Sequence, residues 1–220
     1  MANLTLRTVP NRGAATRDSL LDAAEQLIAD HGFRAPSHRM IAGEAGAHAA
    51  LVNYHFGSKE MLFEAAVERR ALRLADAWRA GLAQLQDEPA LSTEQVLRAW
   101  FAPFDDLRSD QDVPWRNYLC VIARLASAPD GNDWYQRHFG TVDRDFQRAL
   151  WQTLPEHAHD VTDAGFRYAR SLFGEVLLHR CGKSGGTCVP RGFRETDTER
   201  LIGFVACGLR GIAREPAVAA

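Results

Sequence analysis

Apolar residues recur at helical spacing along most of this 220-residue chain. Between residues 16 and 30, for example, Leu20, Ala24 and Leu27 fall on one face of an α-helix. No segment shows the sustained alternation of apolar and polar residues that is typical of a half-buried β-strand. The chain is therefore predicted to fold as an all-α protein.

Residues that commonly start or stop helices divide this pattern into segments. Thr16, Ser58 and Ser92 are predicted N-caps, the last within a capping box that ends at Gln95, and Gly32 is a predicted stop. Helices are expected over residues 16–30, 37–45, 47–56, from 59 toward Pro89, after Ser92, and over 113–128, 133–153, 161–180 and 195–213, with the glycine-rich segment 181–194 as a connector.

The long helix after Ser58 is expected to bury one apolar face. The residues available for that face are Met61, Leu62, Ala65, Ala66, Leu72 and Ala77. Its length makes this helix the natural lever between an N-terminal and a C-terminal part of the chain.

Composition and charge exclude several classes of protein. The chain is 46% apolar and 25% charged, which is typical of a globular protein rather than a disordered one. Its formal net charge is −2, so any nucleic-acid binding has to come from a local basic patch. The N-terminus lacks the apolar core of a signal peptide and no apolar run could span a bilayer, so a cytoplasmic protein without membrane contact is expected.

Residues 37–56 fit a helix-turn-helix on physical grounds. Ala42 supplies a small side chain where two short helices cross, and Gly46 permits the sharp turn between them. Ile41, Leu51 and Phe56 can close a small core against the first helix. In a helix-turn-helix the second helix enters the DNA major groove, with its N-terminal residues near the base edges.

The stretch "LVNYHFGSKEML", residues 51–62, carries polar residues that suit this role. The hydroxyl of Tyr54 and the imidazole of His55 can donate to phosphates, and Lys59 adds charge at the start of the next helix, where backbone amides also favour an anion. Such contacts position a protein on DNA without reading its sequence. The candidate base-reading residues are Arg39, His48, Ala49, Ala50 and Asn53.

The segments "TRDSLLDAAEQLIADHGF" and "MIAGEAGAHAALVNYHFGSKEMLFEAAVERR" resemble the DNA-binding domain of TetR/AcrR-family repressors. The resemblance covers residues 16 to 70, and its Tyr-His-Phe-x-Ser-Lys-Glu core is specific to that family. It implies phosphate contacts at Thr16, Tyr54, His55 and Lys59, and base contacts at Arg39 and the start of the recognition helix. The complete set of candidate DNA-binding residues is Thr16, Ser37, Arg39, His48, Ala49, Ala50, Asn53, Tyr54, His55 and Lys59.

The same resemblance implies a homodimer that binds a palindromic double-stranded operator and releases it when a small molecule enters the C-terminal domain. The expected organisation is a flexible arm over residues 1–15, a three-helix helix-turn-helix domain over 16–60, and a helical ligand-binding and dimerisation domain over 61–220. The C-terminal part is also similar to the fatty-acid-responsive subgroup, which implies an acyl or otherwise hydrophobic effector. No cofactor and no metal are expected.

Large aromatic residues of the C-terminal domain suggest a pocket for that effector. Most of these rings are expected to fill the core, but a helical bundle that contains so many rings can enclose an apolar cavity. Arg116 and Asn117 are candidate polar groups that orient the ligand. The predicted pocket residues are Trp78, Trp100, Phe104, Trp115, Tyr118, Arg124, Phe146, Phe173 and His179.

The last helix is predicted to form a dimer interface. Gly203, Cys207 and Gly211 recur every four residues beside an apolar stripe that includes Val205. Small residues allow close approach of helices, and a stripe of this width needs a partner, either within one subunit or from a second copy. The predicted interface residues are Phe173, Val176, Gly203, Val205, Cys207 and Gly211.

Other functions fit parts of the same sequence. A catalytic set of Tyr54, His55 and Lys59 is disfavoured because no acidic partner has a suitable spacing, so the chain is not expected to be an enzyme. Cys181 and Cys188 flank a glycine-rich loop and are either a redox switch or ordinary loop thiols in a reducing compartment. A regulator that answers to a redox or protein signal, and a DNA-binding protein without sequence preference, stay as alternatives.

Overall fold

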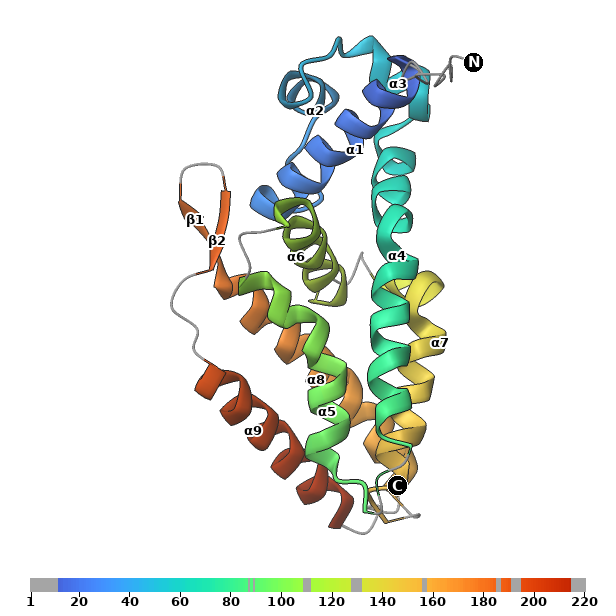
Figure 1. Cartoon of the computed structure of the whole chain (residues 1–220), viewed down its shortest axis with the longest axis vertical. Coiled ribbons are helices and arrows are strands. Elements are labelled where there is room, and N and C mark those ends of the chain that lie inside the picture. Colours follow the sequence, from blue (N-terminus) through green and yellow to red (C-terminus); the bar gives the residue numbers. More distant parts are fainter. Residues whose placement is uncertain are drawn as a thin grey trace, which may run out of the picture.

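The structure, a computed structural model, describes residues 12–86, 88, 90–108, 112–127, 132–155, 158–184, 187–190 and 195–214. Helices dominate these residues, as the sequence predicts, and they form two tiers (Figure 1). The helical elements are α1 (Arg12–His31), α2 (His38–Glu44), α3 (Ala50–Phe56), α4 (Lys59–Gln84), α5 (Thr93–Phe101), the 3-10 helix η1 (Ala102–Arg108), α6 (Val113–Ser127), α7 (Asn132–Trp151), α8 (His159–Arg180) and α9 (Glu195–Arg214).

The first tier consists of α1, α2 and α3 at one end of the molecule (Figure 1). Leu20 and Ala24 of α1 are fully buried, together with Ile41 of α2 and Val52 of α3. The sequence predicts Leu51 in this core, but Val52 takes the central place and Leu51 is only partly buried. These contacts fix the crossing of α2 and α3, so the tier is a helix-turn-helix.

Two helix starts differ from the sequence prediction. The first helix begins at Arg12 rather than at Thr16, so Thr16 lies inside α1 and is not its N-cap, and residues 12–15 are helical rather than part of an arm. The recognition helix begins at Ala50 rather than at Ala47, with Ala49 as an N-cap that makes no side-chain hydrogen bond. Because the alanine side chain cannot accept from the first free amides, the start of α3 has no side-chain cap.

Helix α4 joins the two tiers and runs along the length of the molecule (Figure 1). Its hydroxyl cap is Ser58, which accepts a hydrogen bond from the backbone amide of Met61, as predicted. The predicted buried face was partly wrong, because Met61 and Leu72 are 60% and 74% exposed and Ala77 is exposed as well. The residues that α4 buries are Leu62, Phe63, Ala66, Val67, Ala71, Leu74, Ala75 and Trp78.

The second tier contains α5 to α9. Helix α5 begins with the predicted capping box, in which Ser92 accepts from the amide of Gln95 and the Gln95 side chain accepts from the amide of Ser92. Helices α8 and α9 lie side by side at one edge of the tier, whereas α6 lies between α1 and α8 (Figure 1). Within the described ranges, no helix is both long and apolar enough to cross a membrane.

A short hairpin follows α8, where the sequence predicts a connector. Strands β1 (Cys181–Ser184) and β2 (Thr187–Pro190) pair antiparallel, with Gly182 opposite Val189. The four-residue strands are too short to show an alternating pattern. The signal in the sequence is the Gly185-Gly186 pair between them, a dipeptide common between hairpin strands.

Gly46 provides the first testable prediction. Its φ is 62°, a conformation that costs an L-residue about 1–2 kcal/mol, and a Cβ there would meet no neighbouring atom within 4 Å. Gly46→Ala should therefore lower the free energy of unfolding by about that amount in urea titrations. Gly43→Ala is the matched control, because Gly43 lies inside α2 with equally open space and should gain about 0.5–1 kcal/mol. Equal effects of the two substitutions would contradict this explanation.

Candidate functional site

The outer face of α2 and α3 presents the side chains predicted to read DNA bases. Arg39 of α2 and Asn53 of α3 are both exposed, and so are His48, Ala49 and Ala50 at the start of the recognition helix. The opposite faces of these helices are buried in the first tier. The predicted readers therefore form one solvent-facing surface around the recognition helix.

The predicted phosphate contacts lie at the far end of the same helix. Tyr54 is 80% exposed and its ring packs edge-on against that of His55, with 5.0 Å between centroids. The Lys59 ammonium stands over the ring of Phe63 at 5.5 Å, in the first turn of α4. This places three polar or cationic groups around the junction of α3 and α4.

Thr16 and Ser37 lie at the edges of this surface. Thr16 is half-buried inside α1. The Ser37 hydroxyl caps α2 by accepting a hydrogen bond from the amide of Met40 at 3.2 Å. Its hydroxyl hydrogen remains available for donation to a phosphate.

Helix α1 is attached to α4 by a buried carboxylate. Glu25 is 1% exposed, and its oxygens accept from Arg69 at 2.9 Å and from Arg70 at 3.3 Å. Arg69 also binds Asp22, at 2.5 Å. Burial raises the pKa of Glu25 to about 7, although both guanidinium groups oppose the rise. The first tier is therefore fixed to α4 by ion pairs centred on a carboxylate withdrawn from water.

Helix α6 holds α1 from the other side. The Arg124 guanidinium donates twice to the carbonyl oxygen of Ala29, at 2.8 and 3.2 Å, near the C-terminal end of α1, where cations are favoured. Asn117 donates to the side-chain oxygen of Gln26 at 2.5 Å. The sequence predicts both Arg124 and Asn117 as ligand-binding residues, but these hydrogen bonds join them to α1.

The remaining predicted pocket residues separate into two groups. Trp115 and Tyr118 stack at 5.5 Å, and Arg73 of α4 lies 4.0 Å over Trp115, so this pair belongs to the junction of α4 and α6. The other group lies deeper in the second tier: Trp78, Trp100, Phe104 and Phe173 form a cluster with centroid distances of 5.2 to 6.0 Å, and Phe146 is fully buried. The side chain of His179 is outside the described residues.

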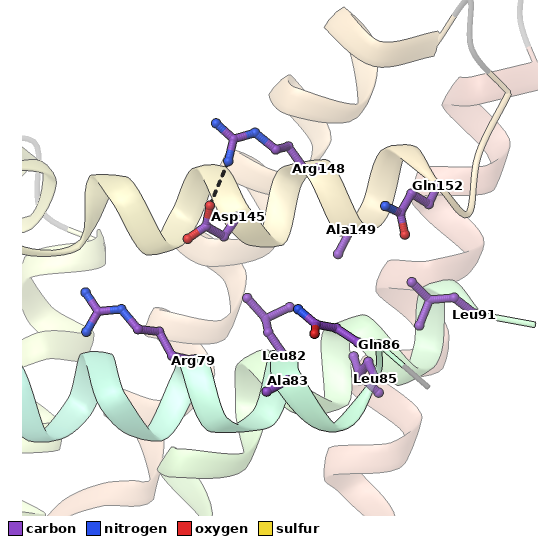
Figure 2. A pocket seen from close by; sticks show the side chains of 10 residues that line it. All are labelled: Arg79, Leu82, Ala83, Leu85, Gln86, Leu91, Asp145, Arg148, Ala149 and Gln152. Carbon is purple, nitrogen blue, oxygen red and sulfur yellow. Dashed lines mark hydrogen bonds and ion pairs between the residues drawn. The ribbon is translucent and has the colours of Figure 1, made fainter. Parts of the chain in front are cut away.

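An open groove lies between the C-terminal halves of α4 and α7 (Figure 2). Leu82 and Leu85 from α4 and Ala149 from α7 give it apolar walls, and its volume is about 370 Å³. Its arginines are neutralised on their own helices, Arg148 by Asp145 and Arg79 by Asp76, each at 2.8 Å. The groove therefore suits an apolar group rather than a free anion.

The outer face of α8 and α9 is apolar and contains the small residues predicted for a dimer interface. Phe204 is 69% exposed beside the exposed Cys207, and Tyr168 of α8 is also exposed. A Cβ built on Gly203 or Gly211 would meet no neighbouring atom. Phe173 is a correction to the predicted interface, because it is fully buried in its own chain and stacks on Trp100.

Comparison with known proteins shows which protein family has these surfaces. Residues 20–66 match bacterial regulatory proteins of the tetR family, and residues 98–208, about half of the chain, match the tetracyclin repressor-like C-terminal domain. The chain belongs to the TetR family. It is a DNA-binding transcriptional regulator, and its helix-turn-helix tier is the part that matches the family's regulatory-protein model.

Individual proteins are similar to this chain in sequence or in fold. The HTH-type transcriptional repressor KstR2 of Mycolicibacterium smegmatis (strain ATCC 700084 / mc(2)155) is 27% identical over 159 residues, which cover 72% of this chain and 71% of the relative. A TetR-like regulator from Rhodococcus sp. RHA1 has a TM-score of 0.60 at 20% identity, covering 94% of this chain and all of its own. The fatty acid degradation regulator FadR from Bacillus halodurans has a TM-score of 0.54 at 18% identity, covering 91% and 97%.

Two features of this TetR-family protein were missed in the sequence. Arg17 stacks over Phe56 at 5.1 Å and brings a cation to the end of the recognition helix. Asp143 and Arg170 form a buried ion pair at 2.8 Å, and Tyr135 donates to the same carboxylate. Each of the two charged residues could have been singled out, because it interrupts an apolar helical stripe, although the sequence does not show that they pair.

Two cysteines have side chains that the structure describes. Cys120 is buried and disulfide-bonded. Cys207 is an exposed free thiol in the single chain. The side chains of Cys181 and Cys188 lie outside those that the structure describes. In the described part of the chain, no three His, Cys, Asp or Glu side chains form a group that could hold a metal.

Glu25 gives a pH-dependent prediction. Between its ordinary pKa of 4.5 and its folded-state pKa of about 7, the folded protein binds more protons than the unfolded one, so this group lowers stability as pH rises through that window. Glutamine does not titrate, so Glu25→Gln should not lose this stability. The unfolding free energy of the variant minus that of the wild type should therefore increase by about 1–3 kcal/mol as pH rises from about 5 to about 8. Urea titrations across that range measure the difference.

Glu68→Gln is the control, because Glu68 is an exposed carboxylate on α4, the helix that carries the arginine partners of Glu25. Its stability should follow that of the wild type across the whole range. A difference between Glu25→Gln and wild type that stays constant with pH would show that Glu25 does not titrate in this window.

Proposed function

We propose that this regulator binds a palindromic operator as a homodimer and represses transcription until a small apolar effector releases it. The observation that carries the proposal is the exposed surface of the helix-turn-helix tier, where the predicted base readers and phosphate contacts lie together. The proposed domains are an arm over residues 1–15, a DNA-binding domain over 16–60 and an effector-binding domain over 61–220. The helical start of α1 shortens the arm by four residues.

Phosphate binding would be centred on the junction of α3 and α4. Lys59 stands in the first turn of α4, where the free amides favour an anion, and Arg17 adds a second cation nearby. Tyr54 and His55 supply further hydrogen-bond donors from the end of α3. Base recognition would fall to Arg39, to Asn53 and to the residues at the start of the recognition helix.

The dimer would form through α8 and α9. Their shared outer surface is a groove of about 260 Å³ lined by Tyr168, Leu172 and Phe204, among other residues that include two glycines. Large apolar side chains beside small residues favour close helix packing. A two-fold axis through this face would pair each helix with its copy and give two recognition helices for the two halves of a palindrome.

The effector would enter the aromatic cluster of the second tier. Trp78, Trp100 and Phe173 pack closely here, so an apolar ligand has to separate rings that are now in contact. Such a ligand therefore binds one conformation better than another, which is what release of DNA requires. The polar groups nearby are the Asp143–Arg170 pair and the buried indole N–H of Trp100.

The effect would reach DNA through α6 and α4. Both helices contact α1 with polar side chains, Arg124 from α6 and Arg69 from α4. A displacement of either helix would move the first tier as one body, because α1 is the core of that tier. The two recognition helices would then lose the spacing of about 34–36 Å that successive major grooves require.

The disulfide at Cys120 is the observation that favours a second candidate, a regulator that answers to a redox signal. Cys120 lies on α6, so its oxidation state could alter the same contacts with α1. Operator affinity that is unchanged after full reduction with dithiothreitol would exclude this form of regulation.

Lys59→Ala tests the DNA-binding surface. The substitution should weaken binding to every DNA sequence and reduce the slope of log affinity against log salt by about one. Fluorescence anisotropy over a salt series measures both quantities. Arg79→Ala is the control, because it removes an exposed cation from the C-terminal half of α4 and should change neither quantity. A change in base preference at one operator position would overturn the phosphate assignment.

Phe204→Asp tests the dimer. A carboxylate in the middle of an apolar interface should raise the dimer dissociation constant by at least about 100-fold, since burying an unpaired charge costs several kcal/mol. Sedimentation equilibrium measures the constant. Leu72→Asp is the control, because Leu72 is equally exposed but lies on α4. An unaltered dimer in Phe204→Asp would place the interface elsewhere.

A further inference from the structure

A continuous chain of ring contacts joins helix α7 of the second tier to the proposed phosphate contact Lys59. Trp134 of α7 meets the ring of Phe33 edge-on, with 5.7 Å between centroids and 73° between planes. Phe33 meets Phe63 of α4 in the same way, at 5.9 Å and 71°. The Lys59 ammonium stands over the Phe63 ring, 5.5 Å from its centroid. Edge-to-face rings and a cation over a ring are attractive geometries, so each contact restrains the next.

The sequence places each of these side chains where it can take part. Lys59 and Phe63 are four residues apart on α4, so they lie on the same face of that helix. Phe33 directly follows Gly32, whose φ of 77° lets the chain leave the helical path at the end of α1. Phe63 is buried, whereas Phe33 and Trp134 are only partly buried, so these two can be replaced with less risk to the core.

An ion pair between the same two helices supports this path. Helix α7 lies beside α4 (Figure 1). Arg137, three residues after Trp134, donates to the carboxylate of Glu64, the neighbour of Phe63 on α4. Both charged side chains are largely exposed, so the pair contributes little stability by itself. Together with the ring contacts, it holds the beginning of α4 against the beginning of α7 at two points.

From this arrangement we infer that Trp134 is a positioning residue for DNA binding, which holds the Lys59 ammonium in place through Phe33 and Phe63. The inference rests on the proposed phosphate contact of Lys59. A lysine side chain is long and flexible, and ordering it on a phosphate costs free energy. A side chain that is already held over a ring in the free protein has lost part of that freedom before DNA binds. Trp134 therefore raises the affinity for DNA although it lies outside the DNA-binding tier.

Helix α7 also reaches the aromatic cluster proposed for the effector. Phe139, further along α7, meets Trp78 edge-on with 5.4 Å between centroids. A ligand that displaces Trp78 therefore acts on α7 as well as on α4. The displacement reaches Lys59 through Trp134, in addition to the contacts that α4 and α6 make with α1.

A double-mutant cycle tests this role. Anisotropy over a salt series measures the affinity of the full-length protein for a fluorescein-labelled duplex of mixed sequence, because phosphate contacts act on every sequence. Trp134→Ala should weaken binding about threefold to tenfold and leave the slope of log affinity against log salt unchanged, because Lys59 still reaches its phosphate. In the Lys59→Ala background, the same substitution should have no further effect.

Trp151→Ala is the matched control, because Trp151 is a partly buried tryptophan at the other end of α7, where it stacks on His159. This substitution should leave the affinity unchanged. Phe33→Leu is a second variant, which removes the middle ring and keeps an apolar side chain. It should weaken binding in the wild-type background and have no further effect in the Lys59→Ala background. Circular dichroism checks the folding of each variant.

The cycle separates a failure of this inference from a failure of the phosphate assignment. If Trp134→Ala and Phe33→Leu weaken binding equally in both backgrounds, they act on the structure at large, and the inference is overturned while the phosphate assignment stands. Unchanged affinity of both variants in the wild-type background would overturn it as well. If Lys59→Ala alters neither the affinity nor the salt slope, the phosphate assignment fails and this inference fails with it.

Discussion

The clamp on helix α1 is the interaction on which the rest of the structure depends. On one side, α4 surrounds the buried Glu25 with Arg69 and Arg70. On the other side, α6 donates from Arg124 to the end of α1. Because α1 carries the core of the helix-turn-helix, these few polar contacts set the position of the recognition helix relative to the whole second tier.

Polar contacts suit this position better than an apolar one. A buried carboxylate with two guanidinium partners is only marginally favourable, since desolvation offsets most of the attraction. Small shifts of α4 or α6 can therefore change the energy of the polar contacts with α1 considerably. An apolar contact would hold α1 against α4 and α6 more strongly, but its energy would differ less between two arrangements of these helices.

The sequence predicted the first tier well because its signals are local. Gly46, the Ser58 cap and the helical stripe of α1 each act within a few residues, and the motif around Tyr54 is specific to the TetR family. The exposed position of the predicted readers follows from the same periodicity. The start of α3 at Ala50 was not predicted, since no capping hydroxyl marks it in the sequence.

The second tier was predicted less well because its side chains choose partners across helices. Arg124 and Asn117 are polar residues in an apolar segment. The residues next to them in the sequence do not indicate that α1 is their partner. Phe173 lies on an apolar stripe that could face either the core or a second copy. The Asp143–Arg170 pair joins the consecutive helices α7 and α8; each charge stands out in an apolar stripe, but only the structure shows that the two meet.

Selection of DNA from a random duplex pool tests most directly whether this protein reads a palindrome as a dimer. The purified protein would be incubated with the pool at physiological salt, and the bound duplexes sequenced over successive rounds. The account predicts enrichment of two inverted half-sites whose centres lie about one helical turn, roughly 10 base pairs, or a multiple of that apart. A pool that stays random, or an enriched site without two-fold symmetry, would contradict it.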